Sequence, residues 1–353
     1  LARQKNNKNK ENRLIASGAA TISFLPNLKL KSSVALDRRN GVSTTFLDPI
    51  STTDGRNSFG TASDNRNMNT VLVFDNILTY NTNIKKHGID VMAGSSYTKS
   101  DYTNSWINGS HFRDDKIQTL NAANKISWDG TGTGASQWAI SSYFARVSYN
   151  YDSKYMLTMN MRADGSSKLH PDHRWGIFPS FSAAWRISSE KFMKDIAWID
   201  DLKLRGGWGQ TGNQSGIGDY SYLQRYNINR IPWFEEGNDH AVPGISQANL
   251  RTSDLKWETT NQTNIGLDLT VLNNRLTFSM DYYYKKTTDM LMNVSLPAGA
   301  AATTSITRNE GEMTNKGFEF AINSHIWPWM RMVCRCDSLS LLVPQRIAQL
   351  QHG

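Results

Sequence analysis

The chain has 353 residues, with 39 Lys and Arg against 31 Asp and Glu, a formal net charge of +8, and only two cysteines. A basic balance raises the question of a nucleic-acid or membrane partner, whereas two cysteines exclude a disulfide scaffold. Aromatic residues make up 10% of the chain, and no heptad or triplet repeat occurs, so coiled-coil, collagen-like and wholly disordered classes are excluded as well. The sequence contains no run of about 18 apolar residues, which is the length that a transmembrane helix requires.

The charge is concentrated at the two ends of the chain. Residues 1–13 have a net charge of +4 and residues 326–353 a net charge of +2, so 14–325 is close to neutral. Asn residues are interleaved with the charges of 1–13, which predicts a solvated basic loop entering the first strand rather than a nucleic-acid site. Residues 326–353 show no strand alternation and contain both cysteines, so we expect a tail outside the main fold.

Between the ends, segment after segment alternates apolar and polar residues. In 154–164, Tyr155, Leu157 and Met159 share one face, while Asn160 and Arg162 share the other. Arg146 likewise falls on the polar parity of its strand, 138–151. A period of two is typical of a strand with one apolar face. The pattern predicts about eleven strands, near 14–24, 28–37, 68–80, 87–97, 138–151, 154–164, 177–187, 202–210, 257–270, 275–288 and 314–325.

The connections between these strands alternate in length. The short ones are 26–27, 81–86, 152–153, 188–201 and 273–274, and the long ones are 38–67, 98–137, 165–176, 211–256 and 289–313. Within 188–201, Phe192, Ile196 and Ile199 recur at helical spacing, which predicts about two turns of helix. Short turns at one end and long loops at the other are typical of an outer-membrane barrel. The predicted fold class is therefore all-β, an antiparallel transmembrane β-barrel segment.

Aromatic residues occur at two kinds of place in this pattern. Those at strand ends are expected to form membrane-interface girdles, namely Tyr80, Tyr97, Tyr151, Tyr155 and Tyr284. Those in the long loops are candidates for stacking on a ligand or contacting a partner, or they pack the loops against each other; they are Trp106, Trp128, Tyr220, Tyr222, Trp233 and Phe234. The loop 211–256 is the best place to look for such contacts.

The sequence predicts neither a metal site nor a catalytic one. His170 and His173 flank a Pro-containing loop and are interpreted as solvated, although nearby imidazoles and a carboxylate could bind a metal. Paired carboxylates such as Glu235 and Glu236 are adjacent in sequence, and nothing places a pair across a cleft as a glycosidase requires. We therefore expect no enzyme activity and no cofactor.

Several segments, in order along the chain, resemble the SusC/RagA family of TonB-dependent outer-membrane transporters. The first is Arg162–Lys168, with the sequence RADGSSK; each segment alone would be weak, and their order makes the resemblance strong. The others are Arg174–Ser180, Ala184–Arg186, Leu202–Gln214, Trp257–Glu258, Asn264–Asp268, Asp281–Tyr283, Thr287–Leu291, Asn309–Gly311 and Asn315–Glu319. The resemblance runs from about Asn12 to about Asn323.

This resemblance implies import of a glycan or a peptide across the outer membrane of a Bacteroidota-type, Gram-negative bacterium. It also implies a SusD-like surface lipoprotein that caps the barrel. A TonB complex would act only through a plug domain, which this sequence lacks. The family's barrel has about 22 strands, so residues 14–325 are expected to form part of one and 326–353 to lie outside it.

Two alternatives remain open at this stage. One is a smaller self-closed outer-membrane barrel that acts as a porin or an adhesin. The other is a soluble β-rich glycan-binding domain, which would explain loop aromatics without a membrane.

Overall fold

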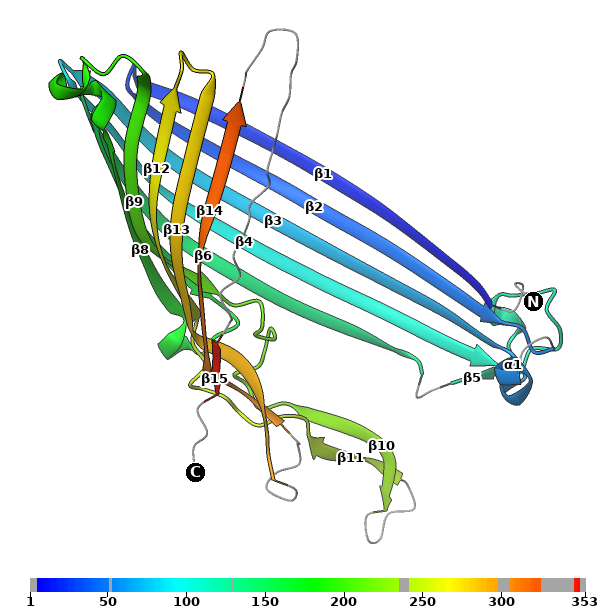
Figure 1. Ribbon diagram of the computed structural model, residues 1–353. Helices are drawn as coiled ribbons and strands as arrows, with labels where there is room; N and C mark the ends of the chain where they lie inside the picture. The colour runs from blue at the N-terminus through cyan, green and yellow to red at the C-terminus, as the bar shows by residue number, and fades with distance from the viewer. Residues whose placement is uncertain are drawn as a thin grey trace.

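The computed structural model describes residues 5–50, 53–127, 130–234, 241–297, 305–324 and 346–349. Its main element is an antiparallel sheet in which eleven long strands follow one another in chain order (Figure 1). These strands are β1 (Lys5–Leu25), β2 (Leu28–Leu47), β3 (Thr61–Ile84), β4 (His87–Ser110), β6 (Gly132–Tyr151), β7 (Tyr155–Ser166), β8 (Trp175–Arg186), β9 (Ile199–Asn213), β12 (Glu258–Val271), β13 (Leu276–Ser295) and β14 (Ser305–Ser324). The eleven predicted strands and the all-β antiparallel fold class are confirmed.

The remaining elements are short and lie mostly in the long connections. They are α1 (Thr53–Ser58), the 3₁₀ turns η1 (Leu120–Ala122), η2 (Pro171–His173), η3 (Ile187–Ser189) and η4 (Lys191–Met193), and the strands β5 (Lys125–Ile126), β10 (Tyr226–Phe234), β11 (Ala241–Gln247) and β15 (Arg346–Gln349). Strands β10 and β11 form a separate hairpin, while β15 lies in the expected tail and pairs with β14. None of the helices in the described ranges is long and apolar enough to cross a bilayer.

The sheet is curved and open along the strands that the structure describes (Figure 1). Of these strands, only β2 pairs with β1, and the order then runs to β14 and β15 without returning to β1. The described strands therefore do not form the smaller self-closed barrel that the sequence left open.

Antiparallel neighbours place the short turns at one end of the sheet and the long connections at the other, except that the 187–198 connection, at the end with the short turns, is longer than the 167–174 connection opposite. We call these two ends the short-turn end, at the upper left of Figure 1, and the long-loop end. The short turns use residues that tolerate the left-handed region: φ is +53° at Asp152, +54° at Asn273 and +62° at Asn274. Asp and Asn accept this conformation more readily than most side chains, which explains why the chain can reverse within a few residues there.

The strands extend farther toward the long-loop end than the sequence predicts. Strand β2 continues to Leu47 and β3 begins at Thr61, both inside the expected loop 38–67. Strand β1 begins at Lys5, so residues 5–13 are strand and not the expected basic loop. Polar side chains lie on both faces there, and some bond across the strands, as Ser43 Oγ does to Asn9 Oδ1 at 2.6 Å. Without apolar alternation, the pairing there depends on the register set by the adjoining alternating residues and on such cross-strand bonds.

The helix expected over 188–201 is absent and is replaced by the two 3₁₀ turns η3 and η4. Glu190 between them is extended, with φ −78° and ψ 153°. The Ser188 hydroxyl donates to Asp201 Oδ1 at 2.6 Å instead of capping a helix, and Ile199 already belongs to β9. These side-chain and strand contacts prevail over a weak local helical pattern.

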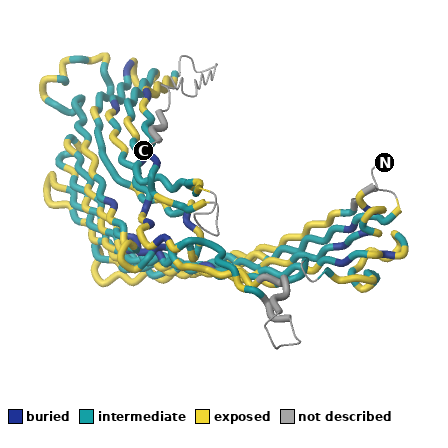
Figure 2. Tube along the Cα trace, turned by 90° about the horizontal axis from the view of Figure 1, so that it is seen from below, coloured by how far each residue is buried: buried dark blue, intermediate teal, exposed yellow. Residues whose placement is uncertain are grey.

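Buried side chains are few and gather at the long-loop end, whereas the strands are mostly intermediate or exposed (Figure 2). One cluster consists of Leu169, Phe178, Ile217, Leu255 and Trp257, with Leu291 packed against it. A second cluster consists of Phe46, Ala62 and Phe112, with Leu120, Ala122 and Ala123 packed against it. The apolar side chains of the strands are not collected into a core, so they must face something other than the chain itself.

Candidate functional site: the apolar face, the polar face and the loop platform

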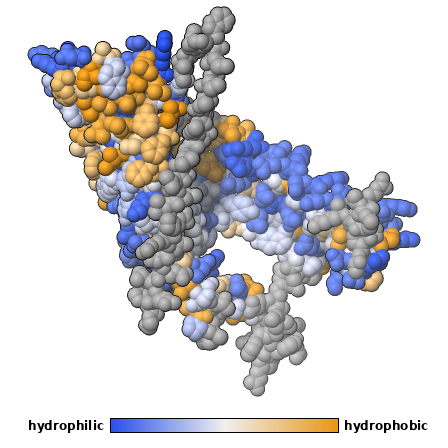
Figure 3. All heavy atoms as spheres, in the orientation of Figure 1, coloured by the Kyte–Doolittle hydropathy of each residue, from blue (hydrophilic) through white to orange (hydrophobic). Residues whose placement is uncertain are grey.

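One face of the sheet is apolar and exposed, and we call it the apolar face. Its rows run across neighbouring strands: Val147 pairs with Met159, and Met159 pairs with Phe181. Figure 3 shows the apolar side chains as a band below a hydrophilic rim at the short-turn end. The exposed members are Val34, Leu72, Phe74, Leu78, Val147, Met159, Met161, Ile177, Phe181, Leu204, Ile265, Phe318, Phe320 and Ile322. A continuous exposed band of this size marks an interaction surface.

Aromatic rings border this band at both margins. At the short-turn end, the Tyr151 and Tyr155 rings stack at 6.3 Å and the Tyr155 and Trp185 rings at 6.4 Å between centroids. At the other margin, the Tyr143 and Trp175 rings stack at 6.0 Å. Tyr143 and Tyr151 are eight positions apart on β6, close to the 9–11 residues with which a tilted strand spans a bilayer.

The structure describes all five aromatics predicted for the membrane interfaces. Tyr80, Tyr97, Tyr155 and Tyr284 are exposed, and Tyr151 is half-buried. Tyr97 pairs with Phe74 on the apolar face, and Tyr284 pairs with Thr263. The sequence prediction omitted Trp175 and Trp185, which the same rule of an aromatic at a strand end would have found, and Tyr143, which lies inside β6 and which that rule misses.

The opposite face of the sheet, the polar face, carries paired charges. Arg205 Nε lies 3.0 Å from Asp268 Oδ2, and its Nη2 lies 2.7 Å from Asp281 Oδ2. Arg146 Nη2 lies 3.2 Å from Asp90 Oδ1, and Arg162 Nε lies 2.8 Å from Asp164 Oδ1. Arg146 and Arg162 thus lie on the polar parity that the alternation predicts, away from the apolar face.

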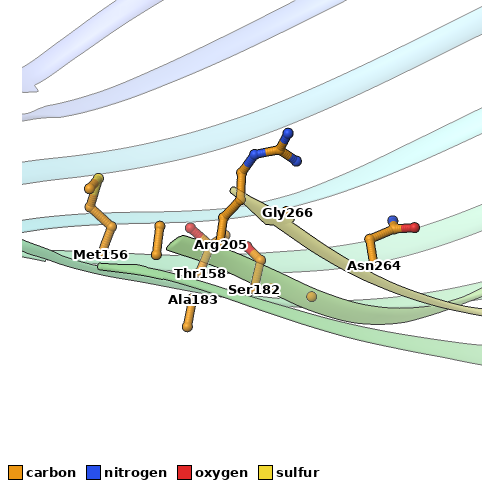
Figure 4. Close-up of a pocket in the computed structure, with 10 residues that line it drawn as sticks. Met156, Thr158, Ser182, Ala183, Arg205, Asn264 and Gly266 are labelled. Carbon is orange, nitrogen blue, oxygen red and sulfur yellow. The ribbon is translucent and has the colours of Figure 1, made fainter. Parts of the chain in front are cut away.

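A hollow of about 240 Å³ lies beside Arg205 on this face. Figure 4 shows it between β7, β8, β9 and β12, where small side chains such as Thr158 and Ser182 leave room. A Cβ at Gly266 would stand 2.7 Å from Arg205 Cζ, so glycine allows the guanidinium to reach its carboxylates. Because two carboxylates already bind Arg205, the hollow offers no free cation to an anionic ligand.

Lys168, in the RADGSSK segment, ties the connection that follows β9 to the sheet. We call Lys168, Ile217, Asp219, Tyr220 and Tyr222 the loop platform. Lys168 Nζ donates to the Ile217 carbonyl at 3.1 Å, lies 3.0 Å from Asp219 Oδ1, and stands 5.6 Å from the Trp138 ring centre. The Lys168 and Asp219 side chains are 14% and 18% exposed. The sequence marked this segment as a family signature but did not reveal its clamping contacts.

The predicted loop aromatics are only partly brought together. Tyr220 and Tyr222 lie on the platform: the Tyr220 hydroxyl accepts a hydrogen bond from the Gln137 backbone N–H at 3.0 Å, and the Tyr222 ring meets His170 edge-on at 6.0 Å. Trp106 is half-buried within β4 and fills the space beside Gly132, where a Cβ would stand 2.8 Å from its ring. None of the contacts of the described residues joins Trp106 to Tyr220 or Tyr222.

Two of the other predicted loop aromatics are on the hairpin. Trp233 and Phe234 are in β10, where their backbones pair with Val242 and Ala241; their side chains lie outside the described residues, as does Trp128. The sequence missed an exposed apolar pair on the same hairpin, Ile228 opposite Ile245, which are 73% and 72% exposed. In the sequence, the only indication of this hairpin was a short run of alternating apolar and polar residues within a long connection.

The histidine loop carries no metal centre in the described part of the chain. His170 Nδ1 lies 3.3 Å from Asp172 Oδ2, and Arg251 Nη2 lies 3.4 Å from His170 Nε2. Within the described ranges, no three His, Cys, Asp or Glu side chains come together as metal ligands would. The histidine therefore serves in loop contacts.

Comparison with known proteins identifies the family. The family model described as TonB dependent receptor-like, beta-barrel matches residues 2–342, which reaches into the 326–353 segment expected to lie outside it. TonB-dependent receptor P39 of Formosa agariphila is 35% identical over 305 residues, 86% of this chain and 28% of that protein. TonB-dependent receptor SusC of Bacteroides thetaiotaomicron is 33% identical over 316 residues, 85% of this chain and 29% of that protein.

Solved structures agree with these matches. The structure of the RagAB peptide transporter superposes with a TM-score of 0.81 at 25% identity, covering 93% of this chain and 35% of that one. The ferric-catecholate import receptor Fiu of E. coli, at 12% identity and a TM-score of 0.56, shares the fold. The chain spans less than a third of the curated relatives P39 and SusC. With its eleven strands, exposed apolar face and signature segments, the chain belongs to the TonB-dependent receptor β-barrel family, among receptors of the SusC/RagA type.

Proposed function

We propose that the chain forms part of the barrel of an outer-membrane transporter that imports nutrients in a TonB-dependent manner. The observation that carries this proposal is the exposed apolar face, bordered by aromatic rings at both margins and backed by a face of paired charges. In a bilayer the apolar face contacts lipid, and closure with further strands removes the unpaired edges. In a soluble glycan-binding domain, such a face would be exposed to water, which is unfavourable for apolar side chains.

The orientation of the barrel in the membrane is inferred from the lengths of the connections at its two ends. Short turns need only reverse the chain on the periplasmic side, whereas long loops carry recognition on the outer side. The loop platform and the β10–β11 hairpin would therefore face the cell exterior. Tyr220 and Tyr222 on the platform supply rings that suit a sugar or a peptide, and either substrate class is consistent with them.

A surface lipoprotein of the SusD type is the proposed partner at the long-loop end. Tyr226, Ile228 and Ile245 on the β10–β11 hairpin are between 61% and 73% exposed. These residues lie at the open end of the hairpin, where Tyr226 pairs with Gln247, and exposed apolar side chains on a projecting element are a common feature of protein interfaces. The TonB complex would act through a plug domain elsewhere in the complete protein, and the substrate would be an oligosaccharide or a peptide.

Cell fractionation and uptake test the proposal. The protein is expected in the outer-membrane fraction, and cells that produce the complete transporter to which it belongs should accumulate a labelled oligosaccharide or oligopeptide only when TonB is present. Recovery in the soluble fraction would overturn the membrane assignment. Uptake that continues without TonB would overturn the TonB-dependent import.

A further inference from the structure

The connection 187–198, at the short-turn end, is attached to the apolar face of the sheet. Glu190 Oε1 accepts hydrogen bonds from the Tyr155 hydroxyl at 2.6 Å and from Trp185 Nε1 at 3.3 Å. Tyr155 and Trp185 are cross-strand partners at the margin of the apolar band. Glu190 Oε2 also accepts from Lys154 Nζ at 3.2 Å. The middle of the connection, around Glu190, is therefore held at the margin of the apolar face, whereas Ser188 at its start bonds to Asp201 on the polar parity of β9.

The segment presents large apolar side chains that nothing in the described chain covers. Phe192 is 63% exposed and Trp198 is 60% exposed. The turn next to it adds Leu272, 56% exposed, whose backbone N–H donates to the Trp198 carbonyl at 3.4 Å. In a folded protein, aromatic rings beside a polar rim suit the headgroup level of a bilayer.

Residues 187–198 have a formal net charge of zero, but two exposed lysines among them could face an anionic lipid surface. Lys191 and Lys194 are exposed beside Phe192, and the exposed Asp195 opposes them. The carboxylate of Glu190 is already paired with Lys154, so it does not cancel the two exposed lysines. Lysines near a membrane surface are attracted to anionic headgroups, and each adds to binding.

We propose that the 187–198 connection is a membrane-contact segment that rests on the phospholipid headgroups of the leaflet at the short-turn end. Phe192 and Trp198 lie at the interface, while Lys191 and Lys194 face lipid phosphates. This proposal rests on the outer-membrane placement proposed above. It makes Glu190 a positioning residue, because its bonds to Tyr155 and Trp185 hold the segment on the lipid side.

Spin labels at single cysteines test the placement in outer-membrane vesicles from cells that produce the protein. The variants Phe192→Cys, Met159→Cys and Lys116→Cys are made in a background of Cys334→Ser and Cys336→Ser. Collisions with oxygen, which dissolves in lipid, and with a water-soluble nickel chelate then report depth. We expect position 159 to be shielded from nickel, position 116 to be open to it, and position 192 to have several-fold fewer nickel collisions than position 116.

The outcomes separate this proposal from the proposed function. If position 192 matches position 116 while 159 stays shielded, the contact segment is wrong and the barrel assignment stands. If position 159 is also open to nickel, both are overturned. If position 192 is shielded from nickel and oxygen alike, a protein covers it and the lipid contact is refuted.

A charge test addresses the headgroups directly, with the purified protein in bilayers. In vesicles of phosphatidylethanolamine and phosphatidylglycerol, the paired change Lys191→Glu and Lys194→Glu should raise nickel collisions at position 192. In phosphatidylcholine alone the same change should have little effect. Equal effects in the two lipids would refute the role of the lysines.

Discussion

Lys168 should determine how firmly the loop carrying Tyr220 and Tyr222 is held on the sheet. Its ammonium donates to the Ile217 carbonyl and pairs with Asp219, and both charged side chains are less than a fifth exposed. Lys168→Met retains the length and the apolar stem of the side chain but removes the charge and the donors. The variant leaves the Asp219 carboxylate in a largely dry site without this partner.

The magnitude follows from these contacts. A hydrogen bond to a charged group contributes about 1.5–3 kcal/mol, and a cation over an aromatic ring adds about 0.5–1 kcal/mol at a partly exposed site. Met recovers part of this by packing on Trp138, so we expect the opening of the loop to become easier by about 2–3 kcal/mol. At about 1.4 kcal/mol per factor of ten, that is roughly a 30- to 150-fold change in the opening equilibrium.

Hydrogen exchange at one backbone amide reports this opening. The Gln137 N–H donates to the Tyr220 hydroxyl at 3.0 Å, so it is protected only while the loop is seated. Lys168→Met should accelerate exchange at Gln137 by the factor given above. The matched control is Lys256→Met, because Lys256 pairs with Asp289 at 2.8 Å but is 53% exposed, and a surface pair contributes at most about 1 kcal/mol.

An unchanged exchange rate at Gln137 in Lys168→Met would refute the clamp. Asp219→Asn adds a second check, because the double variant should lose less than the sum of the two single losses if the residues act as a pair. Simple additivity would mean that Lys168 and Asp219 act independently.

Three further predictions concern the sheet and its rim. A Cβ at Gly212 would clash with the Phe178 ring, so Gly212→Ala should lower the free energy of unfolding, measured by urea titration, by about 1–3 kcal/mol. The control Gly18→Ala should not show this loss, because a Cβ at Gly18 would have nothing within 4 Å. Met159→Arg places a charge on the apolar face and should lower the free energy of unfolding from a bilayer by about 2–4 kcal/mol. Met159→Leu should lower it by less than about 1.5 kcal/mol, and equal losses for the two variants would show that this face does not contact lipid. The hydrogen bond from Tyr155, with smaller contributions from Lys154 and Trp185, lowers the pKa of Glu190. The stabilisation that the Glu190 carboxylate gives to the 187–198 connection is therefore complete above the ordinary Glu pKa and is lost as the pH falls through the lowered value. The mobility of a spin label at position 192 should rise over that pH range in the wild type and stay pH-independent in Glu190→Gln.

The strands that carry the apolar face could be predicted because each one has its own alternating pattern. In β7, Tyr155, Leu157 and Met159 point one way and Thr158 and Asn160 the other, and the period of two requires no knowledge of the neighbouring strands. The same reasoning placed Arg146 and Arg162 on the polar face. It failed for Lys5–Arg13 and for the outer halves of β2 and β3, because side chains that are polar on both faces carry no alternation.

Candidate contact residues were predicted less well, because their roles depend on distant partners. Tyr220 was predicted as a ligand-contact candidate, yet its hydroxyl bonds to Gln137, 83 positions away. Trp106 was expected in a loop and lies within β4, beside Gly132. Their roles in binding remain predictions.

The strand count, the antiparallel order, the two faces and, through the signature segments, the family could all be inferred from the amino-acid sequence. These properties depend on residues close in the chain, where alternation and turn residues act directly. The contacts that hold the rim and the loops emerge only in the folded protein: Lys168 reaches Ile217 across 49 positions, and Tyr155 reaches Glu190 across 35. The physical reason is that such contacts arise only after the strand register brings both ends of each pair to the same margin of the sheet.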